Sequence, residues 1–269
     1  YSPFMSYPLT DKRQSGILTP SFGSSGDGGT AISIPYYFNL AQNYDATIEV
    51  TSLSDRGVLF DNEFRYMGHN KTRSLINFAH LENDDEYGDD RYIYNIDDNR
   101  TLYSTLASNR SGLIGTMISS DLSYSRVSDR DYFNDFGNSL STVSQSSVKR
   151  EIRLFGETYT DEDIYSYELS SLYYQPSTSG VDEQYETVPS FKFNYKNKSN
   201  SEFNYHIKAS IDKFEHKDNS VVEGTRYLFY PSIEMPLLSD GWEVTPKFGI
   251  RHIDYSLDNN TVDPKSKTT

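Results

Sequence analysis

The sequence contains no cysteine, few basic residues and no long apolar run. Because Cys is absent, neither a disulfide framework nor a thiolate metal site can form within these 269 residues. No stretch of eighteen residues is apolar throughout, which excludes a helical membrane span. The 25 Lys and Arg face 39 Asp and Glu, and the net charge of −14 argues against a nucleic-acid partner, because neutralising phosphates requires clustered bases.

Signatures of catalysis are also lacking. The histidines are not spaced as metal ligands, and no serine lies in a recognisable nucleophile elbow. We therefore expect no enzyme activity, no cofactor and no metal site built on these histidines. The histidines are His69, His80, His206, His216 and His252.

Aromatic side chains are abundant in a chain that is polar on average. They make up 14% of the residues, while the mean hydropathy is −0.68. Strands with one apolar face explain both numbers, since every second residue of a transmembrane β-barrel strand faces a polar lumen. A secreted sandwich or an extracellular adhesin would have a similar composition, so the pattern along the chain must separate these classes.

Apolar and polar residues alternate with a period of two over long stretches. The clearest run places Phe203, Tyr205, Ile207, Ala209 and Ile211 on one face and Asn204, His206, Lys208, Ser210 and Asp212 on the other. Strands of soluble sheets average five or six residues, whereas a tilted membrane strand needs about nine to eleven. This run is long enough to span a membrane.

The same pattern predicts about thirteen strands joined by connections of alternating length. The strands are expected at 16–22, 28–40, 45–54, 57–68, 72–82, 100–109, 112–123, 147–156, 163–174, 187–197, 201–214, 225–236 and 241–255. Every second connection is tight, and long connections are expected at 83–99, 124–146, 175–186 and 215–224. Outer-membrane barrels have short periplasmic turns and longer outer loops. The sequence therefore predicts an all-β, antiparallel transmembrane barrel whose first strand runs outward.

An acidic segment falls in the first long connection. Eight acids and one base, Arg91, lie between Glu82 and Asp98, so this segment carries half of the net charge. A solvated loop on the cell exterior is the simplest interpretation. A divalent-cation site is the alternative.

Several segments closely resemble the LptD family, the lipopolysaccharide-assembly proteins of the Gram-negative outer membrane. They are DKRQSGILTP at 11–20, IPYYFNLAQNYDAT at 34–47, EFRY at 63–66, VSD at 127–129, YFNDF at 132–136 and PSIEMPL at 231–237, together with Arg56, Gly57, Arg226 and Trp242. The resemblance runs in order through most of the chain. It implies a barrel of 26 strands, a size known for outer-membrane barrels, preceded by a periplasmic jelly roll.

The resemblance also implies a domain division and partners. Residues 1–14 are expected to end the jelly roll, and residues 15–269 to form the N-terminal half of the barrel, here a partial barrel of about 13 strands. Because the chain opens in mid-pattern at Tyr1 and stops on a polar tail, we expect a targeting segment outside it. The implied partners are lipopolysaccharide, the plug lipoprotein LptE, the periplasmic bridge protein LptA and outer-membrane lipid.

Two prolines fall inside the first two predicted strands. Pro has no N–H to give to a sheet ladder, so Pro20 and Pro35 predict deliberately weak pairing. In a protein that resembles LptD, this hairpin is expected to form a lateral gate through which lipopolysaccharide enters the outer leaflet. The alternative is that prolines merely mark bulges, as Pro189, Pro231 and Pro246 also lie inside predicted strands. The expected gate residues are Gly16, Ile17, Leu18, Thr19, Pro20, Phe22 and Pro35.

Polar residues of the predicted strands are expected to face the lumen, where they contact lipopolysaccharide or the plug, or simply keep the interior wet. They are Glu63, Arg65, Asn204, His206 and Lys208. Two other functions remain open at this point. A passive porin would need a constriction loop folded into the pore, and a soluble adhesive protein would present charges on both strand faces.

Overall fold

The computed structural model describes residues 12–25, 28–69, 72–110, 112–136, 146–197 and 202–258. β-Strand is the main secondary structure of these residues, and they include one short helix, α1, at Tyr132–Phe136. Within these ranges, no helix is long and apolar enough to cross a membrane. The expected jelly-roll end at 1–14 falls mostly on residues 1–11, which lie outside the described residues.

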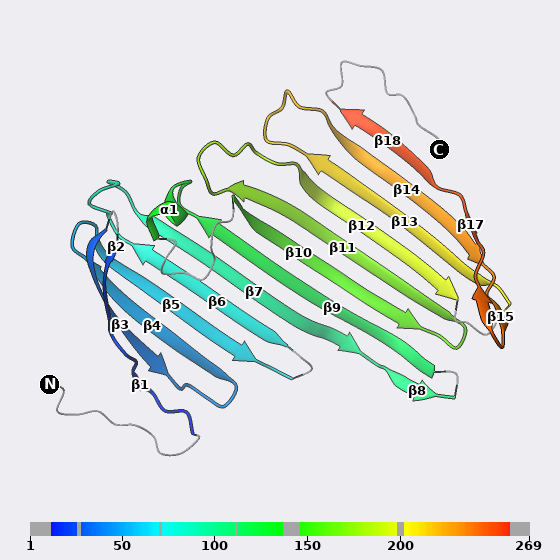
Figure 1. Ribbon diagram of the computed structural model, residues 1–269, viewed down its shortest axis with the longest axis horizontal. Helices are drawn as coiled ribbons and strands as arrows, with labels where there is room; N and C mark the ends of the chain where they lie inside the picture. Colours follow the sequence, from blue (N-terminus) through cyan, green and yellow to red (C-terminus); the bar gives the residue numbers. More distant parts are fainter. Residues whose placement is uncertain are drawn as a thin grey trace. The chain divides into compact units, whose positions relative to one another are not determined.

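The strands follow one another in an antiparallel sheet (Figure 1). Their bounds are β1 Gly16–Ile17, β2 Ser21–Ser25, β3 Gly29–Phe38, β4 Tyr44–Leu53, β5 Gly57–Met67, β6 Arg73–Leu81, β7 Arg91–Ser104, β8 Ala107–Asn109, β9 Gly112–Val127, β10 Ser147–Tyr159, β11 Asp163–Pro176, β12 Glu186–Asn197, β13 Asn204–Glu215, β14 Glu223–Glu234, β17 Lys247–Gly249 and β18 His252–Asp258. A separate two-stranded sheet pairs β15, Leu237–Ser239, with β16, Trp242–Val244. The hydrogen-bonded order is β1-β3-β4-β5-β6-β7-β9-β10-β11-β12-β13-β14-β17, with β2 on β3, β8 on β9 and β18 on β14.

The all-β, antiparallel prediction is confirmed, and three strand predictions need correction. The strand expected at 100–109 begins at Arg91, so the first long connection shrinks from 83–99 to the residues between Leu81 and Arg91. The first strand is split into β1 and β2. The strand expected at 241–255 is broken into β16, β17 and β18, because Pro246 and Pro231 lack an N–H: the Pro246 carbonyl accepts from Met235 and the Pro231 carbonyl from Ile250, but neither proline can return a bond.

The chain divides into two compact units, which are described separately. The first consists of Tyr1–Asp98, Tyr124–Val148 and Pro176–Val181, and the second of Asn99–Ser123, Lys149–Gln175 and Asp182–Thr269.

In the first unit, β3, β4 and β5 present one apolar and one polar face. Ile34 lies opposite Val50, which lies opposite Phe60, and these side chains are 50%, 36% and 47% exposed. Their row forms the apolar face, which nothing in the described unit covers. The other face carries Ser33 and Thr51, whose hydroxyls form a 2.7 Å hydrogen bond. Each strand therefore alternates as the sequence predicts.

In the second unit, β12, β13 and β14 alternate in the same way. Tyr195 pairs with Ile207, and Ala209 with Phe229, on an apolar face. The opposite, polar face carries a buried cluster in which Asp212 accepts hydrogen bonds from Ser190 at 2.6 Å and Arg226 at 2.8 Å. This face is polar through most of its length.

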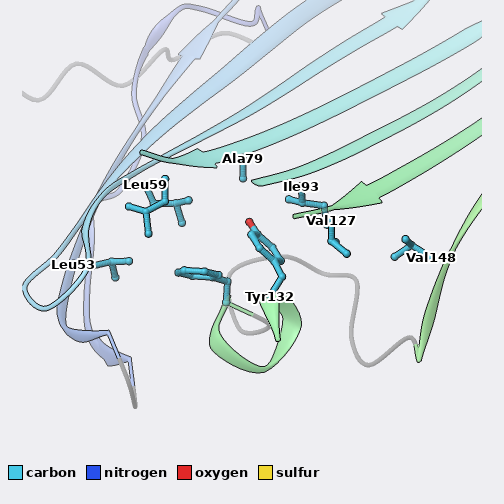
Figure 2. Close-up of a cluster of buried hydrophobic side chains, with 9 residues drawn as sticks. Leu53, Leu59, Ala79, Ile93, Val127, Tyr132 and Val148 are labelled. Atoms are coloured by element: carbon cyan, nitrogen blue, oxygen red, sulfur yellow. The ribbon is translucent and has the colours of Figure 1, made fainter. Parts of the chain in front are cut away.

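The buried hydrophobic cluster lies in the first unit. Figure 2 shows α1 beneath the sheet, with the Tyr132 ring directed toward Leu59, Ala79 and Ile93. Leu59 lies opposite Thr51 in the register, so it belongs to the polar face. The segment after β9 therefore folds back over the polar face, where α1 covers the apolar patch made by Leu59, Ala79 and Leu81. The members of the cluster are Leu53, Leu59, Ala79, Leu81, Ile93, Val127, Tyr132, Phe136 and Val148.

Candidate functional site

The first sheet edge holds the residues predicted for the gate. Within the described residues, β1 and β2 pair with β3 alone, which leaves their other edge without a ladder partner. Ile17 and Phe22 are 67% and 77% exposed on this edge. An edge strand with free N–H and C=O groups is a template for pairing with another strand.

The edge is interrupted around Pro20. Ile17 lies opposite Tyr36, and Ser21 lies opposite Ser33, so three residues of the edge face only two of β3. One extra residue in one strand is a β-bulge, and proline inside a sheet is confined to such places or to edges. The prediction that Pro20 lies within the first strand is therefore wrong in detail, because Pro20 lies in the break between β1 and β2.

Pro35 removes a hydrogen bond on the edge side of β3. The Leu18 N–H donates to the Pro35 carbonyl over 2.9 Å. In an antiparallel ladder, a residue's N–H and C=O point to the same neighbouring strand. The donor that Pro35 lacks would therefore face the edge strand, and the Leu18–Pro35 pair makes one bond where another pair would make two.

The residues that precede β1 are tied to the turn between β3 and β4. Arg13 Nη1 lies 2.7 Å from Asp45 Oδ2, and Arg13 Nη2 donates to the Gln42 carbonyl at 2.6 Å. Asn39 donates to the Arg13 carbonyl, and its N–H bonds to Ser15 Oγ. The edge is thus held at its start and weakened at its middle.

A pocket of about 380 Å³ lies between this edge and α1. Its lining includes Ser24, Ser33 and Glu49 from the sheet and Asp135 and Phe136 from the helical segment. The pocket thus places the polar face of β3 and β4 beside the segment that follows β9.

Two buried arginines hold the α1 segment in place. Arg56 Nη1 lies 2.8 Å from Asp84 and 3.1 Å from Asp135. Arg91, which is fully buried, lies 2.6 Å from Asp129 and 2.9 Å from Asp135. Charged hydrogen bonds of this kind are the stronger class, and buried guanidiniums require them. The arginines therefore join the β4–β5 turn and β7 to the loop that carries α1.

Burial and charge act in opposite directions on this cluster. Burial alone would lower the pKa of Arg56, but the hydrogen bond to Asp84 and the charges of Asp135 and Glu86 raise it above its usual value. Burial raises the pKa of the Tyr132 phenol, whose oxygen has no hydrogen-bond partner among the described residues. Tyr132 is therefore held as the neutral phenol.

The acidic segment is only partly a solvated loop. Asp84 is fully buried between Arg56 and Arg91, whereas Asp85 is exposed. Across the described ranges, no group of His, Asp and Glu is arranged to hold a metal ion. The cations that neutralise Asp84 are the protein's own arginines.

The predicted lumen residues lie on the polar faces, in separate units. In the first unit, Arg65 Nε is 2.7 Å from Asp45 and 3.5 Å from Glu63. In the second, Asn204, His206 and Lys208 share one face of β13. Whether these residues contact lipopolysaccharide or a plug stays a prediction.

The arginine cluster was not predicted from the sequence. Arg56 lies in the tight turn between β4 and β5, a position that does not predict the burial of its side chain. The available signal was that Arg91 is the single base within a run of acids. Asp129 and Asp135 lie in the two short motifs that resemble the family, and both contact Arg91.

Comparison with known proteins decides the family. A family model described as LptD, LPS transport system D, matches residues 89–269. The chain belongs to the LptD family. An "LPS-assembly protein LptD" of Thiobacillus denitrificans is 33% identical over 264 residues, which cover 98% of this chain and 34% of that protein. Proteins of the same name from Aromatoleum aromaticum and Ralstonia nicotianae are 32% and 30% identical over 96% and 98% of this chain and 31% of their own length.

The chain spans about a third of the length of these LptD relatives. The LptD family model includes Arg91, Asp129 and Asp135 but starts after the first sheet edge. The alignment with the Thiobacillus LptD extends over nearly the whole chain.

Proposed function

We propose that this chain takes part in assembling lipopolysaccharide in the bacterial outer membrane, with β1, β2 and β3 forming one side of a lateral gate. Relatives named LPS-assembly proteins support the cargo and the location. The observation that carries the gate is the Leu18–Pro35 pair, where a bulge and a missing donor weaken an edge that already has a partner on one side only.

The chemistry of the cargo explains why a weak edge is useful. Lipopolysaccharide joins sugars, which need water, to acyl chains, which need hydrocarbon. A closed barrel offers water inside and hydrocarbon outside, so the molecule can leave only through a slit between strands. A backbone N–H or C=O group left without a hydrogen bond in lipid costs several kcal/mol. A formed backbone hydrogen bond in water contributes only about 0.5–1.5 kcal/mol net. The bond that is missing between Leu18 and Pro35 lets the edge strand move away from β3 more easily when the slit opens.

The proposal includes the partners that the family resemblance implies. A plug lipoprotein, LptE, would occupy the lumen, and the periplasmic bridge protein LptA would deliver lipopolysaccharide from the periplasm. Outer-membrane lipid would receive the acyl chains at β1 and β2. Ile17 and Phe22, which are exposed on this edge, are suited to contact those chains.

A passive porin is the second candidate, because one observation favours it. The α1 segment folds over the polar face of the first unit, as a constriction loop in a porin does. Membership in a family named for LPS transport favours the assembly role. A passive pore would not supply lipopolysaccharide to the surface, so an export assay separates the two.

Replacing Pro20 and Pro35 by alanine should slow lipopolysaccharide export without unfolding the protein. An alanine N–H at position 35 would face the edge strand and complete the pair with Leu18, which raises the free energy of opening. One or two additional bonds predict a rate about tenfold lower, since about 1.4 kcal/mol corresponds to a factor of ten. Export is measured as the appearance of newly made lipopolysaccharide at the surface of cells that carry the full-length variant.

The matched control is Pro231→Ala in β14. Pro231 lies inside a ladder with a partner strand on each side, opposite Ile207 and bonded through its carbonyl to Ile250 N–H. Its replacement should leave the export rate unchanged. Equal export in the double variant and the wild type, with equal amounts of folded protein, would refute the gate.

A further inference from the structure

A pocket of about 320 Å³ lies in the second unit, on the polar face of β11, β12 and β13. Lys196 lies opposite His206, and Asn194 lies opposite Lys208, so the two lysines are diagonal neighbours across the β12–β13 ladder. Diagonal neighbours lie about 7–8 Å apart, within reach of one ligand for long side chains. The volume is at the lower end of the range for small-molecule sites. Residues that line the pocket include Glu157, Ser166, Asn194, Lys196, His206 and Lys208.

The two lysines differ from the other lysines of this face. Lys192 lies 2.8 Å from Glu168, and Lys247 lies 2.6 Å from Glu234. Among the described residues, Lys196 and Lys208 form neither an ion pair nor a hydrogen bond. Like charges at neighbouring sheet positions repel and destabilise the ladder. In a chain with a net charge of −14, these two lysines have no carboxylate at ion-pair distance among the described residues; Glu234, which pairs with Lys247, acts on Lys196 only from farther away.

The remaining groups of the pocket do not offset the lysines. Glu157 is the one carboxylate in the lining, and it accepts hydrogen bonds from Tyr159 and Ser166. His206 lies beside the lysines, and its Nε2 is buried without a hydrogen bond, 3.5 Å from Glu234. Asn194 adds a side-chain amide that can donate. The pocket therefore offers two positive charges and neutral donors against one engaged carboxylate in its lining, with a second carboxylate, Glu234, nearby but paired with Lys247.

We infer that this pocket binds a phosphate group between Lys196 and Lys208. Lysine is a compact charge that commonly binds phosphate, and charged hydrogen bonds to phosphate are roughly twice as strong as neutral ones. A bound phosphate would neutralise the repulsion between the two ammonium groups. The phosphate belongs to lipopolysaccharide in transit if the proposed function is right, whereas the site itself does not rest on that function.

The test compares the wild type with the Lys196→Gln, Lys208→Gln double variant, as full-length protein in a neutral detergent. The primary probes are lipopolysaccharide and the same lipopolysaccharide stripped of its phosphate esters. The wild type should bind the phosphorylated form about tenfold more tightly, and the double variant should bind both forms equally. The preference should weaken as salt is raised, because screening reduces the attraction of exposed charges.

Lys192→Gln is the control for each single variant, Lys196→Gln and Lys208→Gln, because it also removes one positive charge from this polar face, four residues from Lys196, but at a lysine that is already paired with Glu168. It should keep the preference for the phosphorylated form, which each single variant should reduce. The same loss in the control as in the single variants would show a general charge effect and overturn the site.

Two further probes identify the carrier of the phosphate. Phosphatidylglycerol micelles present a phospholipid headgroup, and inorganic pyrophosphate presents the anion alone. Binding of either that depends on the two lysines, without a preference for phosphorylated lipopolysaccharide, supports the site and contradicts lipopolysaccharide as its ligand. If no probe depends on the two lysines, the phosphate site is refuted, whether or not the proline variants slow export.

Discussion

Single buried charges decide whether the α1 segment stays on the polar face. Asp84 is fully buried and lies 2.8 Å from Arg56 and 3.5 Å from Arg91. It neutralises guanidiniums that have left water, and such pairs are costly to break from one side because the other charge remains buried. The cluster therefore depends on every carboxylate in it.

Asp84→Asn should destabilise the first unit by about 3–5 kcal/mol, the usual cost of removing one partner of a buried ion pair. The reason is that Arg56 and Arg91 would keep their burial with one carboxylate fewer. Unfolding midpoints and protease cleavage after Arg130, next to α1, both report the change. The exposed neighbour Asp85→Asn is the control and should alter neither measurement. Equal behaviour of the two variants would contradict the structural role of Asp84.

For a single residue, the sequence shows which face of a strand its side chain lies on more readily than which side chain it contacts. Glu63 and Arg65 could be assigned to a polar face from period two alone, since that pattern is local. The pairing of Arg56 with Asp135 joins residues 79 apart in sequence, and no local pattern carries such a contact. The acidic composition of 82–98 predicted a solvated loop, because composition cannot show that Arg56 reaches into the segment or that Arg91 is buried within it.

Among the elements, regular strands were predicted well and interrupted ones were not. β3, β4 and β5 lie within two residues of their expected ends, since their alternation is unbroken. β7 begins nine residues earlier than expected because Asp97 and Asp98 concealed the alternation that starts at Arg91. The bulge at Pro20 depends on register with β3, which a single strand's sequence does not contain.

The interruption between β7 and β8 depends on Gly115 of β9. Its φ of +129° is a conformation that side-chain-bearing residues rarely adopt, and an added Cβ would collide with the Thr105 carbonyl. Thr105 N–H also donates to the Thr116 carbonyl at 3.0 Å. The absence of a side chain thus lets the two strands approach where β7 leaves the ladder.

Gly115→Ala should therefore lower the free energy of unfolding more than Gly112→Ala. Gly112 has a φ of +109° but no neighbouring atom where its Cβ would lie, so it carries the backbone strain without the collision. Strained conformations cost on the order of 1–3 kcal/mol each, and the collision should add to that for Gly115. Thermal unfolding of both variants in detergent gives the comparison. A Gly112 variant at least as unstable as the Gly115 variant would contradict the close approach.

At the scale of the whole molecule, composition and alternation predict that one face of the strands meets lipid and the other meets water. Many apolar side chains are exposed in both units, as expected for strands that face lipid on one side. A water-soluble protein rarely exposes apolar patches of this extent. Composition alone does not exclude a β-sandwich. A sandwich would bury the apolar faces, which are exposed in each unit.

Two adjacent residues of β14 test which solvent each face meets. Leu228 lies opposite Ser210 on the polar face, and Phe229 lies opposite Ala209 on the apolar face. If the apolar face contacts lipid, Phe229→Lys should cost about 2–4 kcal/mol when the residue is near the bilayer midplane. Leu228→Lys should cost less, because its ammonium group can remain in water. Unfolding of the full-length protein in phospholipid vesicles measures both.

The pair is informative because each variant makes the same kind of change, from a large apolar side chain to lysine, one residue apart. Phe229 is 49% exposed, and a lysine at such a position facing water would change stability by roughly 0.5 kcal/mol or less. Equal and small effects would place both faces in water and remove the hydrocarbon that the gate requires. A large loss of stability in Phe229→Lys alone requires lipid on that face, because within the described residues nothing covers the side chain that could otherwise disfavour a charge.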